Sequence, residues 1–211
     1  MLTSEIPIIP GTIVRTLIIA WISAIAVGTF ALWQYDSAPG PAGHGNLILA
    51  SRARSELDEP NRFKICVFLH PRCPCSVATV RELERMLSLI AKPVDVQAYL
   101  YCPRSETEGW TKVGAGEVVR KIPGMNVTID WEADLARQLG VGTSGHVLVY
   151  SPSGDLRFTG GITTSRGHEG DSTGKLSILS TINSGVETGV LEEPVYGCPL
   201  FSTEIGRRGD Q

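Results

Sequence analysis

The chain has no excess of basic residues. Its 19 lysines and arginines are outnumbered by 22 aspartates and glutamates, and the net charge is −3, with an isoelectric point near 5.8. Proteins that bind nucleic acid present a basic surface to the phosphate backbone. The composition therefore excludes DNA and RNA as partners.

Cysteine is scarce as well. The 211 residues include five cysteines, which are Cys66, Cys73, Cys75, Cys102 and Cys198. Disulfide scaffolds are far richer in cysteine, and an odd number leaves at least one thiol unpaired. The sequence also has no internal repeat, which excludes a solenoid. Reactivity therefore explains the cysteines better than covalent stabilisation of the fold.

One long hydrophobic run lies near the N-terminus. From Thr16 to Trp33, about 18 residues are uncharged and mostly apolar, close to the length at which a helix crosses a bilayer. A cleavable signal peptide has a shorter apolar core of about 7–15 residues and needs a small-residue cleavage site. Ser37-Ala38-Pro39 is a poor cleavage site. We predict an uncleaved, membrane-spanning helix, with a cleaved signal peptide as the alternative.

The charges beside this run predict its orientation. Arg15 precedes it and Asp36 follows it, which favours an N-terminus inside the cell and the remaining chain outside. We expect a single-pass protein of the bacterial inner membrane whose domain faces the periplasm. The Pro/Gly-rich stretch from Asp36 to Gly45 is typical of a tether. The predicted divisions are an N-terminal segment with the anchor (1–35), a polar linker (36–62), a folded domain (63–190) and a C-terminal tail (191–211).

The hydrophobic pattern of the domain alternates between strand and helix. Residues 64–69 form a continuous apolar run typical of a buried strand, and from Ser76 apolar residues recur every three or four positions, as in an amphipathic helix. Pro93 ends that helix, and residues 94–101 supply a second strand, which completes a βαβ unit. Further on, the pattern predicts a strand at 127–129, a helix at 131–139, a β-hairpin of 146–150 and 156–159, and a closing helix at 175–182.

Two cysteines one residue apart mark the first strand-to-helix turn. This turn reads Phe68-Leu69-His70-Pro71-Arg72-Cys73-Pro74-Cys75-Ser76. Unpaired N–H groups and the helix dipole stabilise a thiolate at a helix N-terminus, so a reactive thiol is expected there. Cys73 comes first, at the end of the strand, and is the predicted nucleophile. We expect Cys75 to resolve a mixed disulfide, with Cys198 as its substitute.

The order of elements resembles the thioredoxin fold from Lys64 to about Gly185. Three stretches carry a closer resemblance to the membrane-anchored, bacterial RedB-like group of thioredoxin-like proteins: the turn quoted above, Thr143-Ser144-Gly145-His146-Val147-Leu148, and Gly160-Gly161-Ile162-Thr163-Thr164-Ser165-Arg166-Gly167-His168-Glu169-Gly170-Asp171. The resemblance implies an α/β domain with a central mixed sheet flanked by helices. It also implies thiol redox chemistry outside the cytoplasm.

The chain departs from thioredoxins in two places. Only Pro74 separates its cysteines, where thioredoxins have two residues, so a Cys73–Cys75 disulfide would close a very small ring. Strain makes such a bond easier to reduce, which favours an oxidant or an isomerase. Where thioredoxins carry a cis-proline before the hairpin, this chain has Thr143-Ser144-Gly145. In the family that proline keeps metals off the thiols, and its absence leaves room for a metal.

The resemblance also brings the loop of residues 163–173 near Cys73. Arg166 or protonated His168 in this loop would lower the pKa of the Cys73 thiol, and Glu169 could move a proton. The alternative is a solvated turn. We take Cys73, Cys75, Arg166 and His168 as the candidate catalytic residues.

Two histidines offer a metal-binding alternative. His70 precedes the cysteines by three positions, and His146 starts the neighbouring strand. Two thiolates with an imidazole suit Cu(I) or Zn(II). The alternative ligand set, with copper as its metal, is Cys73, Cys75, His70 and His146.

Three functions are thus expected. The first is a membrane-tethered thiol-disulfide oxidoreductase without a cofactor, which acts on protein or small-molecule thiols and disulfides and serves cell redox homeostasis. The second is a thioredoxin-fold chaperone for copper or another soft metal. The third is an interaction module that is redox-inactive.

Overall fold

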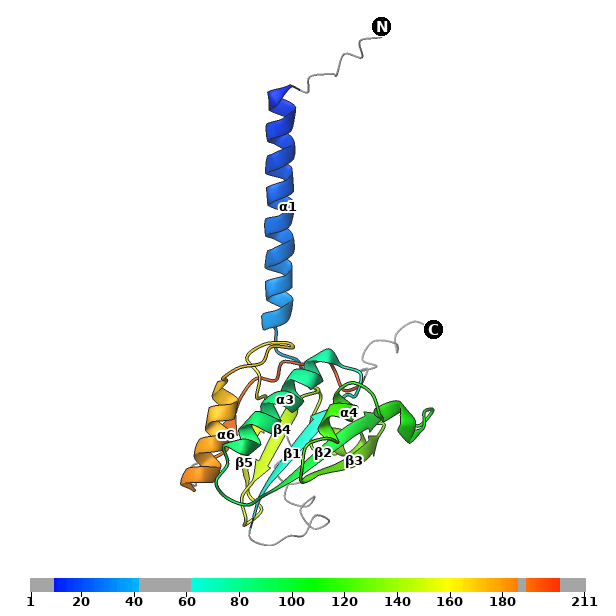
Figure 1. The fold of residues 1–211 in the computed structure, drawn as a ribbon, viewed down its shortest axis with the longest axis vertical. Helices are drawn as coiled ribbons and strands as arrows, with labels where there is room; N and C mark the ends of the chain where they lie inside the picture. The colour runs from blue at the N-terminus through cyan, green and yellow to red at the C-terminus, as the bar shows by residue number, and fades with distance from the viewer. Residues whose placement is uncertain (1–9, 42–61, 186–188, 202–211) are drawn as a thin grey trace, which may run out of the picture. The chain divides into compact units, whose positions relative to one another are not determined.

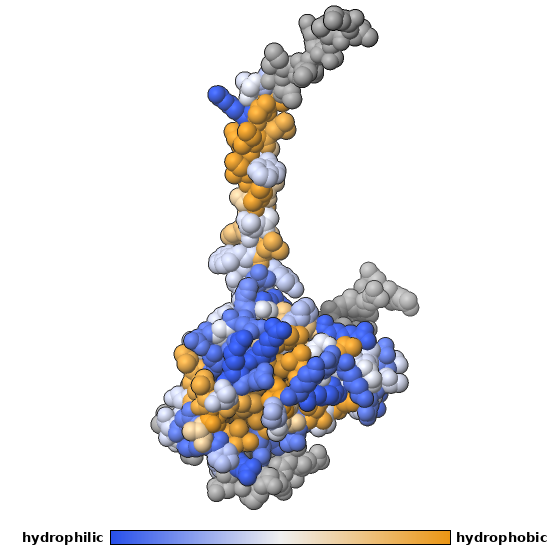
Figure 2. Space-filling view, in the orientation of Figure 1, coloured by the Kyte–Doolittle hydropathy of each residue, from blue (hydrophilic) through white to orange (hydrophobic). Residues whose placement is uncertain are grey.

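The computed structural model describes residues 10–41, 62–185 and 189–201, and the chain divides into two units, Met1–Ala38 and Pro39–Gln211. The first unit contains helix α1, Gly11–Ser37, which includes the apolar run from Thr16 to Trp33. Apolar side chains cover much of its surface (Figure 2), and its length and composition are those of a candidate membrane span. Most of the predicted linker lies outside the described residues.

The second unit contains a six-stranded mixed sheet (Figure 1). Its strands are β1 (Phe63–Leu69), β2 (Val94–Cys102), β3 (Met125–Trp131), β4 (His146–Tyr150), β5 (Leu156–Gly160) and β6 (Leu191–Glu192). They lie in the order β3-β2-β1-β4-β5-β6. The β1–β2 and β2–β3 pairs are parallel, whereas β4 is antiparallel to both β1 and β5.

Helices cover both faces of this sheet. They are α3 (Pro74–Ser88), α4 (Ala115–Val119), α5 (Asp134–Gln138) and α6 (Thr173–Ser184), with a 3₁₀ turn, η2, at Glu108–Thr111. Because side chains alternate along a strand, β1 sends Ile65 and Val67 into the core under α3, α4 and α6, and sends Cys66 and Phe68 into the core under α5. The cysteine turn therefore leaves a strand that is buried on both sides.

This arrangement is the thioredoxin-like fold, and it confirms the predicted fold class. A parallel βαβ unit is followed by a hairpin whose first strand, β4, runs antiparallel to β1, and α6 closes the domain. Strand β3 adds to the far edge, beside β2.

The helix predicted at 131–139 is shorter than expected. Strand β3 continues to Trp131, and α5 begins only at Asp134. Glu132 and Ala133 have positive φ angles of 54° and 57°, which break the helical path. The Asp130 carboxylate accepts hydrogen bonds from the backbone N–H groups of Leu135 and Ala136 at 2.9 and 3.0 Å and so fixes the helix start.

Candidate thiol site

Cys73 occupies the position that the sequence pattern predicts for it. It is the N-cap residue of α3, directly after β1, and Pro74 follows at the first helical position. Proline suits that position because a helix leaves its first N–H groups unpaired in any case. The backbone N–H of Ser76 donates to the Cys73 carbonyl at 3.1 Å and closes the first turn. The Cys73 side chain thus stands at the positive end of a 15-residue helix.

Three sulfur atoms meet at this helix start. The Sγ atoms of Cys73 and Cys198 are 2.9 Å apart, and those of Cys73, Cys75 and Cys198 all lie within 4.8 Å of one another. Cys73 is buried, while Cys75 and Cys198 are half-buried, and all three are free thiols. The cysteine expected only as a substitute is therefore in direct contact with the predicted nucleophile.

The other two cysteines are buried away from this cluster. Burial raises the pKa of the Cys66 thiol to about 12, and Lys64 offsets this only in part. Burial also raises the pKa of Cys102, whose Sγ donates to the carbonyl oxygens of Pro103 and Thr107. Cys66 stays protonated at neutral pH, in keeping with a thiol that serves packing.

Cys198 reaches the site because residues 195–200, here named the C-terminal arm, pair with the loop before β4. The Ser144 N–H donates to the Cys198 carbonyl and the Leu200 N–H donates to the Gly142 carbonyl, both at 2.9 Å, while Thr143 and Pro199 form an antiparallel bridge. This loop is the stretch that replaces the thioredoxin cis-proline, and the described residues contain no cis peptide bond.

Glycine is required at position 197 by this close approach. A Cβ atom on Gly197 would lie 2.0 Å from the Ser144 carbonyl oxygen, far inside van der Waals contact. The Arg166 guanidinium donates to the Gly197 carbonyl. Ser144 and Arg166 therefore both contact the arm at Gly197.

Two buried hydroxyl groups support Cys73. The Oγ atoms of Ser76, in α3, and Ser144 are 2.5 Å apart, and the His70 N–H donates to Ser144 Oγ at 2.7 Å. Because the Ser144 oxygen accepts the His70 N–H, its hydroxyl is free to donate a hydrogen bond to Ser76 Oγ. The Ser76 hydroxyl can in turn donate a hydrogen bond to the Cys73 sulfur. Sequence reasoning missed both serines, although Ser76 directly follows the second cysteine and Ser144 lies in the stretch compared with the cis-proline.

These contacts make Cys73 the most acidic of the three thiols. Burial raises its pKa, but hydrogen bonds from Cys198 and Ser76 outweigh burial, and the pKa of Cys73 falls below its usual value. Burial and the neighbouring Cys73 thiolate raise the pKa of Cys75, and they raise the pKa of Cys198 to about 12. The site can therefore hold one thiolate beside two thiols.

The loop after β5 brings Arg166 to the sulfurs and leaves His168 at the surface. The positive charge of Arg166 acts to lower the pKa of Cys75, although burial and Cys73 outweigh it. His168 is exposed, and its backbone N–H donates to the Ser165 carbonyl at 3.3 Å. Glu169 pairs with Arg81 at 2.8 Å and with Arg85 at 2.5 Å, so it fastens the loop to α3.

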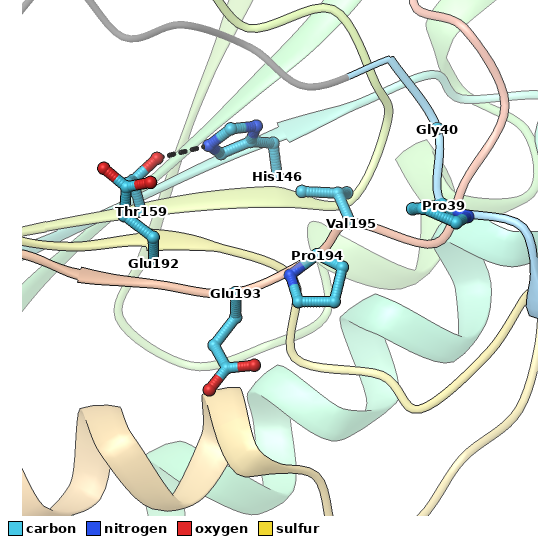
Figure 3. A pocket seen from close by; sticks show the side chains of 8 residues that line it. All are labelled: Pro39, Gly40, His146, Thr159, Glu192, Glu193, Pro194 and Val195. Carbon is cyan, nitrogen blue, oxygen red and sulfur yellow. Dashed lines mark hydrogen bonds between the residues drawn. The ribbon is translucent and has the colours of Figure 1, made fainter.

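Neither histidine of the expected copper site belongs to the sulfur cluster. His70 Nδ1 accepts the Arg72 N–H at 3.2 Å, and the ring stacks on Tyr101 with centroids 5.3 Å apart. His146 Nε2 lies 2.7 Å from Thr159 Oγ1. Figure 3 shows this hydrogen bond and the small pocket that the His146 ring lines with residues of β5 and of segments 39–40 and 192–195. Within the described ranges, the metal-capable group consists of Cys73, Cys75 and Cys198, so Cys198 stands in place of the expected histidines.

No protein-family model matches this chain, and no curated protein matches it. Among solved structures, the hypothetical protein SMc02350 from Sinorhizobium meliloti 1021 is 18% identical with a TM-score of 0.55, over 80% of this chain and 93% of that one. An uncharacterized conserved protein from Geobacillus kaustophilus is 15% identical with a TM-score of 0.51, over 68% and 79%. A secreted Mycobacterium tuberculosis disulfide oxidoreductase gives 13% identity and a TM-score of 0.41, over 59% and 83%. The first two likenesses concern the fold alone.

Proposed function

We propose that this protein is a membrane-tethered thiol-disulfide oxidoreductase whose redox centre consists of Cys73, Cys75 and Cys198. The observation that carries the proposal is the 2.9 Å contact between the Sγ atoms of Cys73 and Cys198 at the N-terminus of α3. A thiolate with further thiols in contact can exchange disulfides without a cofactor.

The reaction is a pair of thiol-disulfide exchanges. The Cys73 thiolate attacks one sulfur of a substrate disulfide, forms a mixed disulfide and releases the first substrate thiolate. A second cysteine of the centre, as its thiolate, attacks the Cys73 sulfur and releases the second substrate thiolate, while its own proton passes to solvent. Two substrate thiols and one protein disulfide result, and the reverse sequence donates a disulfide to a dithiol substrate.

The surrounding residues tune this exchange. The N-terminus of α3 and the Ser76 hydroxyl stabilise the Cys73 thiolate, and Arg166 supplies positive charge beside Cys75. His168, in the same loop, is exposed and is the weaker of the two candidates for a positive charge that favours the Cys73 thiolate.

Helix α1 would hold this centre at the bacterial inner membrane, facing the periplasm. Arg15 before the apolar run supports that orientation, and an oxidising compartment suits disulfide chemistry with protein or small-molecule thiols. A role in cell redox homeostasis and the sequence resemblance to the RedB-like group agree with this location. Labelling of intact, mildly reduced cells with a membrane-impermeant maleimide tests it, because the half-buried Cys75 and Cys198 would react only if the domain faces outward.

Replacement of the nucleophile tests the function. Cys73→Ser in the full chain, held in detergent, should abolish insulin reduction and disulfide exchange. Cys66→Ser is the matched control, because Cys66 is buried under α5 and should leave the rate unchanged. Unchanged turnover in Cys73→Ser would rule out the proposal.

The sulfur cluster also supports a second function, the binding of Cu(I) or another soft cation as cargo. Three sulfurs within 4.8 Å offer a donor set that thiophilic metals prefer. Anaerobic titration of Cu(I) against a chromophoric chelator tests this, with the Cys73→Ser/Cys75→Ser double variant as control. Equal affinity in both proteins would exclude it. Thiols that resist alkylation and show no redox couple would instead favour the redox-inactive interaction module.

A further inference from the structure

The C-terminal arm holds Cys198 in place from both sides of that residue. Before it, the Gly40 N–H donates to the Val195 carbonyl at 2.8 Å, and Arg166 donates to the Gly197 carbonyl. After it, the Leu200 N–H donates to the Gly142 carbonyl, and the Leu200 side chain, only 2% exposed, packs into the core under α5. The contact between Cys198 and Cys73 is therefore set by the fold around it.

Cys75 is less well placed to bond with Cys73. It lies in the first turn of α3, separated from Cys73 only by Pro74, so a bond between the two sulfurs would close a very small, strained ring. Hydrogen bonds also hold the carbonyls of both cysteines: the Ser76 N–H donates to the Cys73 carbonyl at 3.1 Å, and Thr79 Oγ1 donates to the Cys75 carbonyl at 3.4 Å. The Sγ atoms of Cys73 and Cys198 are already 2.9 Å apart, and a disulfide bond would bring them to about 2.05 Å.

We propose that Cys198, rather than Cys75, resolves the mixed disulfide at Cys73, so that the oxidised protein carries a Cys73–Cys198 disulfide. The inference rests on the oxidoreductase function proposed above. In this step the Cys198 thiolate forms a bond to the Cys73 sulfur, the bond between Cys73 and the substrate sulfur breaks, and the substrate leaves as a thiolate that takes a proton from solvent. The substrate disulfide is reduced by two electrons and the two protein thiols are oxidised.

The arm also restricts which substrates can approach. Its hydrogen bonds occupy the Ser144 N–H and the Gly142 carbonyl, the groups through which an extended polypeptide would pair with this loop. A polypeptide that pairs with this loop would therefore compete with the arm for these two groups.

Trapping of the mixed disulfide tests the proposal. The full-length protein in detergent is reduced, desalted and mixed with oxidised glutathione, and the reaction is quenched in acid, alkylated and mapped by mass spectrometry. Wild type and Cys75→Ser should form the Cys73–Cys198 disulfide. Cys198→Ser should stop with glutathione on Cys73, with an adduct lifetime about tenfold longer or more, because the intramolecular thiol at high effective concentration is gone.

A second variant keeps the Cys198 sulfur. Gly197→Val would place a Cβ against the Ser144 carbonyl and lift the arm, so it should accumulate the glutathione adduct as Cys198→Ser does. Cys102→Ser, a buried cysteine outside the cluster, should behave as wild type.

The opposite pattern overturns the inference. If Cys75→Ser accumulates the adduct while Cys198→Ser completes the reaction through a Cys73–Cys75 disulfide, then Cys75 is the resolving residue and the oxidoreductase function stands. If wild-type Cys73 forms neither an adduct nor a disulfide, the oxidoreductase function fails together with the inference.

Discussion

The Oγ atoms of Ser144 and Ser76 lie 2.5 Å apart, so the loop before β4 is hydrogen-bonded directly to the first turn of α3. This contact joins the segment that pairs with the C-terminal arm to the helix whose N-cap is Cys73. The loss of either hydroxyl should therefore change the pKa of the Cys73 thiol.

Removal of the Ser76 hydroxyl should weaken the acidity of Cys73. A hydrogen bond to a charged group contributes about 1.5–3 kcal/mol. Ser76→Ala should therefore raise the pKa of the Cys73 thiol, and Ser144→Ala should raise it by less. The pH dependence of alkylation by iodoacetamide measures both. Ser88→Ala, at the other end of α3, is the control, and an unchanged pKa in Ser76→Ala would contradict the hydrogen-bonded chain.

Arg166 and His168 should differ in their effect on turnover. Arg166→Gln removes a positive charge beside Cys75 and the hydrogen bond to the Gly197 carbonyl, so disulfide exchange should slow by about tenfold, as expected for the loss of a charged hydrogen bond. His168→Gln, two residues further along the same loop but exposed, should change the rate little. Steady-state exchange kinetics with a peptide disulfide compare the two. Equal losses would show that both side chains act at the thiols.

The buried ion pair between Glu82 and Lys175 should stabilise the packing of α3 against α6. Glu82 Oε2 lies 3.0 Å from Lys175 Nζ, the Glu82 side chain is fully buried, and its other oxygen accepts the Gly170 N–H at 2.9 Å. Glu82→Gln removes the buried partner of Lys175, which keeps its ion pair with the exposed Asp171 at 2.6 Å, so the free energy of unfolding should fall by about 1.5–3 kcal/mol, as for the loss of a charged hydrogen bond. Urea denaturation measures the loss. Glu84→Gln, on the exposed side of the same helix, should cost little, and equal stability of the two variants would refute the role of the pair.

His146 should make the domain sensitive to acid. Burial lowers the pKa of its imidazole from 6.5 to about 4, so the unfolded chain takes up a proton at a higher pH than the folded one does. Stability due to this residue is complete above pH 6.5 and is lost as the pH falls from 6.5 toward 4, by up to about 3 kcal/mol.

Urea unfolding of wild type and His146→Gln across this pH range tests the assignment. Wild type should lose more stability than the variant, because only wild type has the imidazole. Carboxylates near the pocket, such as Glu192 and Glu193, are common to both proteins, so their titration cancels in the comparison. Parallel curves would show that the imidazole titrates in the folded state as it does in the unfolded one.

Local pattern was sufficient for much of this fold. Continuous apolar runs predicted β1 and β2, a period of three to four residues predicted α3, and the apolar run up to Trp33 predicted α1. Cys73 was expected at a helix start because strand, proline and helix follow one another directly in the chain. The helix expected at Trp131 was wrong at its N-terminal end, because the Asp130 side chain and two positive φ angles there override the hydrophobic period.

The sequence by itself determined β1, α3, β2, the β4–β5 hairpin and α6, their order and the position of Cys73, because hydrophobic periodicity and helix capping depend on neighbours a few residues away. The tertiary structure alone decided that Cys198, 125 residues further on, touches Cys73, and that Ser144 reaches Ser76. Both contacts come from irregular segments, the C-terminal arm and the loop before β4. Hydrogen bonds between such segments depend on where the packed sheet places them. No residue periodicity in the sequence predicts these bonds.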